Sequence, residues 1–539
     1  MERLLVPSAL YRDFLHAPAR VGRYYAADFR DLTALSALAS ARVYPDARRA
    51  EMAALLRRQA ERFGTASDSA ASLRAFERPG ALAVVAGQQP GLFGGPLYTF
   101  YKALTAVALA RSLASASGRP VVPVFWVASD DHDFEEVRRA IVHDGTEPRA
   151  LEIGADAAPA GASIARVGLD GSMTALLDAA AALLPPSEFR EDLIARLRDA
   201  WSPGRTWGEA FARFMGGFLA PLGSLVFDPS DPEAKRLALP VFEREIELGG
   251  GSAAAARDRG EELARAGYHA QIARHGDELN LFWHTDRREA VRVLPDGGFR
   301  LAESVRPLGR AEFLRLVRER PEDASPGVLL RPMMQDLLFP TAAYVGGPSE
   351  VAYWAQVAAL YPLFDLPATP IAPRAGATLL EPRVAKVLDR FGLRWDALAG
   401  DVESVIGGAL RVLLPEDFPA LFARERGGWS ESFARLKQAV VAFDPSLQSA
   451  VDTAAGRVTH EGEHLEKKLM QVWKRRQEES VQQIRRAAGQ LFPFGGLQER
   501  TFSILGFAAR YGPGLLPRMA SAAETPGTHV LLPLGGPQG

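Results

Sequence analysis

The 539-residue sequence contains no cysteine. This absence excludes disulfide bonds, thiolate nucleophiles and zinc sites with cysteine ligands. The sequence also lacks any run of about 18 apolar residues, the length of a typical transmembrane helix. Charges at Glu2 and Arg3 interrupt the apolar segment that a secretory signal peptide requires. We therefore expect a cytoplasmic protein that does not bind membranes.

An excess of one charge sign is missing as well, because the formal net charge is −2 at pH 7. This balance gives no global attraction to nucleic acid, so any anion site must be local. The glycine-rich segment 87–96 lacks the Gly-Lys-Ser/Thr end of a Walker A loop and does not match Gly-x-Gly-x-x-Gly. A tight turn and a ligand-binding loop both remain compatible with it.

What the sequence does contain is a repeated order of buried strand, loop and helix. The clearest strand pattern is 81–86, followed by the glycine-rich loop and an apolar helix over 97–110. A helical segment over 8–78 precedes it. Further strands are expected at 121–128, 223–227, 328–336 and 342–348. This order predicts an α/β fold with a Rossmann-like parallel sheet.

The length suggests about three or four structural units. We predict a Rossmann-like core domain over 1–375 with an inserted β-rich segment at about 253–316, and a helical domain over 376–539. In the latter, helices are expected at 381–391 and 416–441, and one continuous rod of roughly 65 Å over 444–491. Such a rod needs a partner helix, which predicts a homodimer formed through 416–491.

Polar side chains follow the first strand and begin the next helix. Gln88 and Gln89 stand at the strand end, Gly94 and Gly95 lie in the loop, and Tyr98 and Lys102 share one helix face. Lys102 is the only charge in an otherwise apolar helix. Because ligands bind beyond the carboxyl ends of parallel strands, we expect these residues at a substrate site.

The second strand ends in Asp130-Asp131-His132-Asp133. Four adjacent residues cannot all converge on one metal ion, so no metal site is identified. Helix capping accounts for part of the cluster, and Asp131 and His132 are candidates for acid/base work. Four other histidines are predicted to lie on the surface: His275, His284, His460 and His464.

A glycine turn at 346–349 meets a further helix, whose free N–H groups favour a carboxylate or phosphate. Arg331 and Arg374 are candidate partners for the same anion.

Several long motifs resemble the BshC family of bacillithiol biosynthesis. They are Gly87-Gln-Gln-Pro-Gly-Leu, Pro123-Val-Phe-Trp-Val-Ala, Arg331-Pro-Met-Met-Gln335, Gly347-Pro-Ser-Glu-Val-Ala-Tyr-Trp354 and Gln498-Glu-Arg500. The resemblance implies a Rossmann-like domain, a C-terminal coiled-coil domain that dimerises, and a ligase that joins L-cysteine to the amine of glucosaminyl-malate. For that reaction, we expect Lys102, Asp131 and His132 to be the catalytic residues. The expected substrate contacts are Gln88, Gln89, Gly94, Gly95, Tyr98, Asp133, Gln335, Gly347, Ser349 and Glu350.

The resemblance also implies a nucleotide site, with ATP or ADP as the expected nucleotide. By position it maps to Leu380, Glu381, Pro382, Arg486, Gly489 and Phe502. Two alternatives remain open from the residues alone. One is a nucleotide-sensing scaffold, and the other is a nucleotidyltransferase that acts on another small acid.

Overall fold

The computed structural model describes residues 2–273, 277–301, 306–414 and 417–535. The chain forms two compact units, Met1–Leu379 with Leu497–Gly539, and Leu380–Gly496. The predicted domain boundary lies at 375/376. The observed division lies close to that point, and the last segment clusters with the first unit.

The first unit is built on a five-stranded parallel sheet with the order β11-β10-β1-β2-β5. The strands are β1 (Leu82–Gln88), β2 (Val121–Val127), β5 (Leu225–Phe227), β10 (Thr341–Gly346) and β11 (Ile371–Pro373). The predicted fold class is therefore confirmed. The segment just before the predicted domain boundary at 375 supplies the edge strand β11.

The strand order opens a crevice at the carboxyl ends of the strands, between β1 and β10. After β1 the chain continues to β2 and β5 on one side, and later returns to β10 and β11 on the other. The loops that follow β1 and β10 therefore diverge, which is the arrangement that opens a binding site at a topological switch point.

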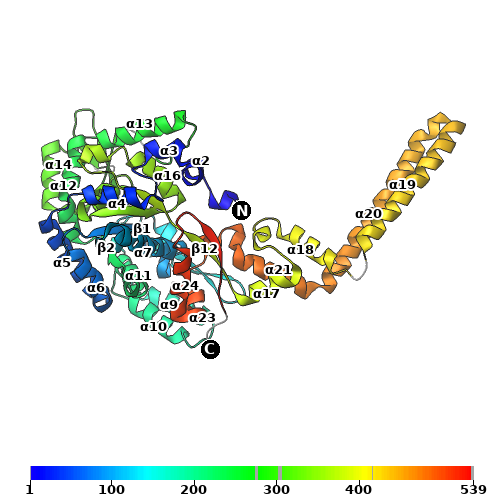
Figure 1. The fold of residues 1–539 in the computed structure, drawn as a ribbon, viewed down its shortest axis with the longest axis horizontal. Helices are drawn as coiled ribbons and strands as arrows, with labels where there is room; N and C mark the ends of the chain where they lie inside the picture. The colour runs from blue at the N-terminus through cyan, green and yellow to red at the C-terminus, as the bar shows by residue number, and fades with distance from the viewer. Residues whose placement is uncertain (1, 274–276, 302–305, 415–416, 536–539) are drawn as a thin grey trace. The chain divides into compact units, whose positions relative to one another are not determined.

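Helices cover both faces of the sheet (Figure 1). Along β2, Phe125 and Val127 belong to one core cluster, and Val124 and Trp126 belong to another, as expected for side chains that alternate between two faces. The helices that contact the sheet are α4 (Leu32–Ala41), α5 (Asp46–Arg62), α6 (Ala66–Glu77), α7 (Tyr98–Ser117), α11 (Trp207–Leu219) and α16 (Pro348–Val357).

Other helices of this unit lie outside the sheet contacts described above. They are α1 (Glu2–Leu5), α2 (Ala9–His16), α3 (Pro18–Val21), α8 (Phe134–Val137), α9 (Ser172–Leu183), α10 (Arg190–Ala200), α22 (Gln498–Thr501), α23 (Leu505–Tyr511) and α24 (Leu515–Ala522). Two small ribbons pair β3 (Arg139–His143) with β4 (Pro148–Glu152), and β12 (Gly376–Leu380) with β13 (His529–Pro533).

One predicted sheet strand is wrong. The segment 328–336 does not enter the sheet, and most of it belongs to helix α15 (Arg331–Leu338). Met333, Met334 and Leu338 are fully buried in the helix. A short apolar run of this kind fits a buried helix as well as a buried strand, so periodicity alone does not separate them.

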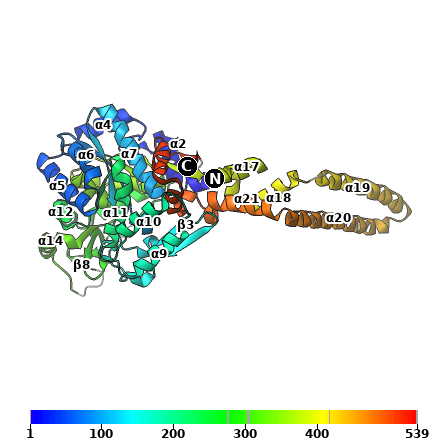
Figure 2. The ribbon, with the colours of Figure 1, turned by 90° about the horizontal axis from the view of Figure 1, so that it is seen from below.

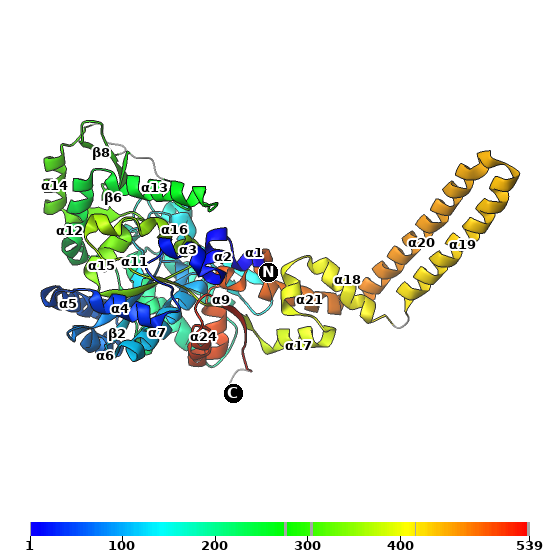
Figure 3. The same cartoon turned by 45° about the horizontal axis from the view of Figure 1, so that its top comes forward.

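The segment predicted as a β-rich insertion, about 253–316, holds three strands of a separate four-stranded sheet with the order β8-β7-β6-β9, and the fourth strand, β9, lies beyond the predicted bounds. Its strands are β6 (Glu278–His284), β7 (Arg288–Val293), β8 (Phe299–Leu301) and β9 (Ala324–Pro326). Figure 3 shows it beside helices α12 (Pro232–Leu248) and α13 (Gly251–Arg265), with α14 (Arg310–Glu319) nearby.

His284, predicted on the surface, is buried in this inserted sheet and only 4 % exposed. Its Nε2 lies 2.8 Å from Ser325 Oγ. Burial lowers the pKa of His284 to about 2, so the ring is neutral at physiological pH. His460 and His464 are exposed as predicted, and His275 lies outside the described residues.

The second unit contains α17 (Pro382–Phe391), α18 (Val402–Val412), α19 (Phe418–Phe443), α20 (Gln448–Arg476) and α21 (Glu478–Leu491). The predicted continuous rod is wrong, because Gln477 leaves helical geometry between α20 and α21. A partner helix for α20 lies within the same chain, and the homodimer stays a prediction. Helices α19 and α20 run side by side as a hairpin (Figures 1 and 2).

A close contact holds the two helices of this hairpin together. The Trp429 ring of α19 lies against Gly462 of α20, where an added Cβ would come within 2.4 Å of the indole. Ion pairs join the helices on either side, Arg426 with Glu466 at 2.6 Å and Lys437 with Asp452 at 2.8 Å. Gly462 is the only residue of α20 that is classed as buried among those described.

None of the described helices is both long enough and apolar enough to span a bilayer.

Candidate active site

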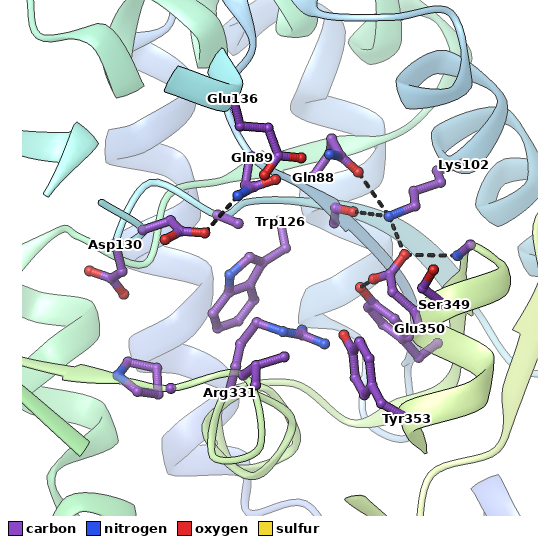
Figure 4. Close-up of a pocket in the computed structure, with 18 of the residues that line it drawn as sticks. Gln88, Gln89, Lys102, Trp126, Asp130, Glu136, Arg331, Ser349, Glu350 and Tyr353 are labelled. Carbon is purple, nitrogen blue, oxygen red and sulfur yellow. Dashed lines mark hydrogen bonds and ion pairs between the residues drawn. The ribbon is translucent and has the colours of Figure 1, made fainter. Parts of the chain in front are cut away.

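A pocket of about 700 Å³ occupies the crevice beyond the carboxyl ends of β1 and β10. Many residues predicted for the site line it: Gln88, Gln89, Tyr98, Lys102, Asp131, Arg331, Gly347, Ser349, Glu350 and Arg374. Figure 4 shows Asp130, Gln89 and Glu136 on one side of the pocket, and Lys102, Ser349 and Glu350 on the other. The sheet topology thus brings together loops that are more than 200 residues apart in sequence.

Lys102 lies on α7 beneath the pocket and is 5 % exposed. Its ammonium group donates to Gly87 O at 3.0 Å and to Gln88 Oε1 at 2.9 Å, and forms an ion pair with Glu350. These three acceptors match the three protons of the ammonium group. Lys102 therefore holds the β1 loop to the start of α16, and its charge is already compensated.

Glu350 is the second centre of this network. One carboxylate oxygen accepts from the Gly347 N–H at 2.7 Å, and the other accepts from the Tyr344 hydroxyl at 2.6 Å. Burial raises the pKa of Glu350, but Lys102 and the two hydrogen bonds outweigh it, so the net pKa lies below the ordinary value. Burial lowers the pKa of Lys102, and Glu350 opposes that change.

Arg331 forms part of the pocket wall, and buried side chains hold its guanidinium in place. Its guanidinium lies 4.7 Å from the Tyr344 ring centre, and its Nη1 donates to Gln335 Oε1 at 2.9 Å. Gln335 is completely buried and donates in turn to Asp336 at 3.0 Å. Gln335, predicted as a substrate contact, therefore orients Arg331 and does not line the pocket.

The opposite wall is acidic. Gln89 Nε2 donates to Asp131 Oδ2 at 2.7 Å, and Asp130 pairs with the buried Lys235 at 2.6 Å. Glu136 projects into the same region from α8 (Figure 4). Burial raises the pKa of Glu136, and Asp133 and Asp131 act in the same direction, against a hydrogen bond from Gln89.

His132 does not line the pocket and is tied to the inserted sheet. Its Nδ1 lies 3.1 Å from Arg288 Nη1, and Arg288 packs 3.9 Å from the centre of the Phe282 ring. Burial and Arg288 lower the pKa of His132, outweighing Asp131 and Asp133. Because arginine only donates, Nδ1 is the acceptor and the proton of the neutral ring sits on Nε2.

Three other predicted residues have structural roles at these loops. Gly94 and Gly95 adopt positive φ angles of 94° and 67° in a buried turn, outside the pocket lining. A Cβ on Gly94 would lie 2.9 Å from the Phe214 ring, which explains the need for glycine there. Asp133 caps α8, accepting from the Glu136 N–H at 3.2 Å.

The residues predicted for a nucleotide site fall in both units. Phe502, in the first unit, is completely buried against His143 and Phe507, which leaves no ring surface for a base to stack on. In the second unit, buried Glu381 accepts hydrogen bonds from Arg383 at 3.1 Å and from Gln490. The others are Leu380, Pro382, Arg486 and Gly489, also in the second unit.

Sequence reasoning missed several residues of the pocket wall: Trp126, Asp130, Glu136, Phe282, Arg288, Tyr353 and Arg500. The position of Glu136 could have been predicted from the sequence, since it lies three residues after the Asp133 cap. Phe282 and Arg288 were not, because only the tertiary fold brings the inserted sheet to this crevice. Among the residues that the structure describes, no group of three or more potential ligands is arranged to hold a metal ion.

Comparison with known proteins agrees with this architecture. Residues 3–375 match the family described as bacillithiol biosynthesis BshC, N-terminal Rossmann-like domain. Residues 377–532 match the corresponding C-terminal coiled-coil domain. The chain belongs to the BshC family.

Relatives of known name match this BshC-family chain over almost all of its length. A Salinibacter ruber protein is 36% identical over 96% of this chain and 94% of its own length. A Koribacter versatilis protein is 33% identical over 97% of each chain, and a Solibacter usitatus protein is 34% identical over 96% of this chain and 95% of its own. All three carry the name "Putative cysteine ligase BshC".

Proposed function

We propose that this chain is a ligase that joins the carboxyl group of L-cysteine to the amine of glucosaminyl-malate, giving bacillithiol. Family membership supports the reaction class, and the charge distribution of the pocket supports the substrates. Asp130, Asp131 and Glu136 line one side, and cationic side chains with the start of α16 line the other. A pocket lined by charges of both signs suits reactants that carry both amines and carboxylates.

The carboxylate side combines two kinds of group. The exposed Ser349 begins α16, where backbone N–H groups and the positive end of the helix dipole favour an anion. Arg331 is held in place by Gln335 and offers the planar donor geometry that binds a carboxylate. We assign a malate carboxylate of the acceptor to this side.

The reaction also needs an energy donor, because amide formation from a free carboxylate is unfavourable in water. We propose ATP as the co-substrate that activates the cysteinyl carboxyl. Negative charge that develops on this group is stabilised by N–H dipoles placed in advance. Lys102 supports that arrangement by holding the β1 loop and the α16 start at fixed positions.

Glu136 is the best placed proton acceptor for the attacking amine. It lines the pocket, and within the described ranges it makes no ion pair that would hold its charge. A raised pKa makes a carboxylate a stronger base. His132 is less suitable, since its Nδ1 is engaged by Arg288 and its Nε2 carries the proton.

We predict that Glu136→Gln lowers kcat by roughly 10²-fold or more, the usual contribution of a general base. In the unsubstituted protein, kcat falls as acidification protonates Glu136, at a higher pH than an ordinary glutamate would give. In the Glu136→Gln variant, this decrease of kcat at low pH should be absent. Glu135→Gln is the matched control, because Glu135 pairs with Arg138 at 2.8 Å and lies outside the pocket lining. Equal kcat in both variants contradicts the assignment.

The proposed reaction is tested by incubating the purified chain with glucosaminyl-malate, cysteine and ATP. Mass spectrometry should detect bacillithiol, together with either AMP or ADP, which identifies the mode of activation. Nucleotide binding without turnover of any acid favours the scaffold alternative. AMP release without a thiol product favours a nucleotidyltransferase.

A further inference from the structure

The motif Gln498-Glu499-Arg500 returns from the end of the chain to the pocket. Gln498 is completely buried and pairs with the backbone of Leu379, accepting from its N–H at 2.7 Å and donating to its carbonyl at 3.1 Å. Two residues beyond Arg500, the Phe502 carbonyl accepts from the Leu97 N–H at 2.8 Å. These bonds fasten helix α22 to strand β12 on one side and to the residue that follows the glycine-rich loop on the other.

Glu499 fixes a second arginine at the same wall. It is 2 % exposed and accepts from Arg374 Nη2 at 2.6 Å. The Arg374 guanidinium carbon lies 5.6 Å from the Tyr98 ring centre, at the pocket surface. Arg374 is therefore committed to Glu499, and its charge is balanced within the protein.

Arg500 differs from every other cation described for this site. It lines the pocket and is exposed, yet among the described residues its guanidinium makes no hydrogen bond or ion pair. Lys102 is paired with Glu350, and Arg374 with Glu499. Arg500 thus presents an uncompensated, bidentate donor on a backbone that is anchored on both sides.

We infer that Arg500 is a specificity-determining residue that binds a carboxylate at the dicarboxylate end of the acceptor substrate. The inference rests on the proposed function and adds to it a residue from the C-terminal segment. Two carboxylates on one acceptor need two donor groups. The α16 start with Arg331 provides one, and Arg500, which lines the same pocket, provides the other.

The test measures binding by calorimetry, without turnover, in the full-length protein. Glucosaminyl-malate is compared with methyl glucosaminide, which keeps the amine but lacks both carboxylates, and with L-cysteine, in the unsubstituted chain, Arg500→Gln and Arg500→Lys. Loss of one charge-assisted contact should weaken glucosaminyl-malate binding by about 10- to 100-fold in Arg500→Gln. Lysine should restore part of it, and binding of methyl glucosaminide and of cysteine should not change. Arg111→Gln, an exposed arginine of α7 outside the pocket, is the matched control.

Each outcome separates this inference from the proposed reaction. If Arg500→Gln binds glucosaminyl-malate as tightly as the unsubstituted chain, the role of Arg500 is refuted and the ligase proposal stands. The same holds if cysteine binding weakens instead. If the unsubstituted chain binds no glucosaminyl-malate, the proposed acceptor is wrong and the inference falls with it.

Discussion

Replacing Lys102 with methionine should lower turnover by 10²-fold or more and destabilise the fold at the same time. Turnover falls because the β1 loop and the α16 start lose their common anchor. Breaking a buried ion pair leaves one charge uncompensated, which typically costs roughly 3–5 kcal/mol. Since the Glu350 side chain is 18% exposed and can regain some water, we expect the lower end, about 3 kcal/mol. Steady-state kinetics and denaturant unfolding measure the two effects.

A double substitution separates the two effects of Lys102. Lys102→Met combined with Glu350→Gln removes both charges, so stability should recover to within about 1 kcal/mol, as for other buried pairs replaced together. Turnover should stay low, because the anchor is still missing. If Lys102→Met alone keeps turnover within a few fold of that of the unsubstituted chain, the proposed anchoring role of Lys102 is refuted.

The second large effect concerns assembly of the hairpin α19–α20. Three apolar residues of α20 remain exposed although α19 packs beside it: Val458 (37 %), Leu465 (58 %) and Val472 (49 %). They are spaced by seven residues, the repeat of a coiled-coil seam. On α19, Leu436 and Phe443 show the same spacing and are 53 % and 89 % exposed. We therefore predict a homodimer, with a mass by light scattering of twice the 58.3 kDa chain.

Charges introduced into the α20 stripe should separate the dimer. Leu465→Glu with Val472→Glu should give the single-chain mass at micromolar concentration, because two buried carboxylates would face the partner. Lys467→Glu is the control, since a residue two positions from Leu465 lies about 200° around the helix. A dimer that persists in the double variant, or an unsubstituted chain that is monomeric, contradicts this assignment of the interface.

The sheet was largely predictable from sequence, for a local reason. Strands such as β1 and β2 carry continuous apolar runs that end in polar loops, and each is followed by a helix. Where the same kind of run was ambiguous, at 328–336, the prediction failed, because burial on all sides produces the same composition in a helix and a strand. The predicted continuous rod over 444–491 failed for a related reason, since no local pattern shows that the helix is interrupted at Gln477 or that α19 and α20 pack against each other.

The site was predictable only in its parts. The isolation of Lys102 in an apolar helix indicated a special role, and the structure places it at the pocket. That its partner is Glu350, 248 positions away, depends on β10 returning beside β1. The sequence alone predicted a cation available to substrate, whereas the structure shows an ammonium group with all three protons engaged.

By itself, the sequence determined the local properties of this protein: the strand and helix types, the turn glycines, the family and the side chains that end each strand. These properties depend on neighbours along the chain, whose spacing and chemistry can be read directly from the sequence. Only the tertiary structure decided which charges are paired and which are free. Arg374 and Arg500 look alike in sequence, but Glu499 compensates one and no described residue compensates the other. Pairing of charges depends on distance in space, which parallel strand order and a returning C-terminal segment set here.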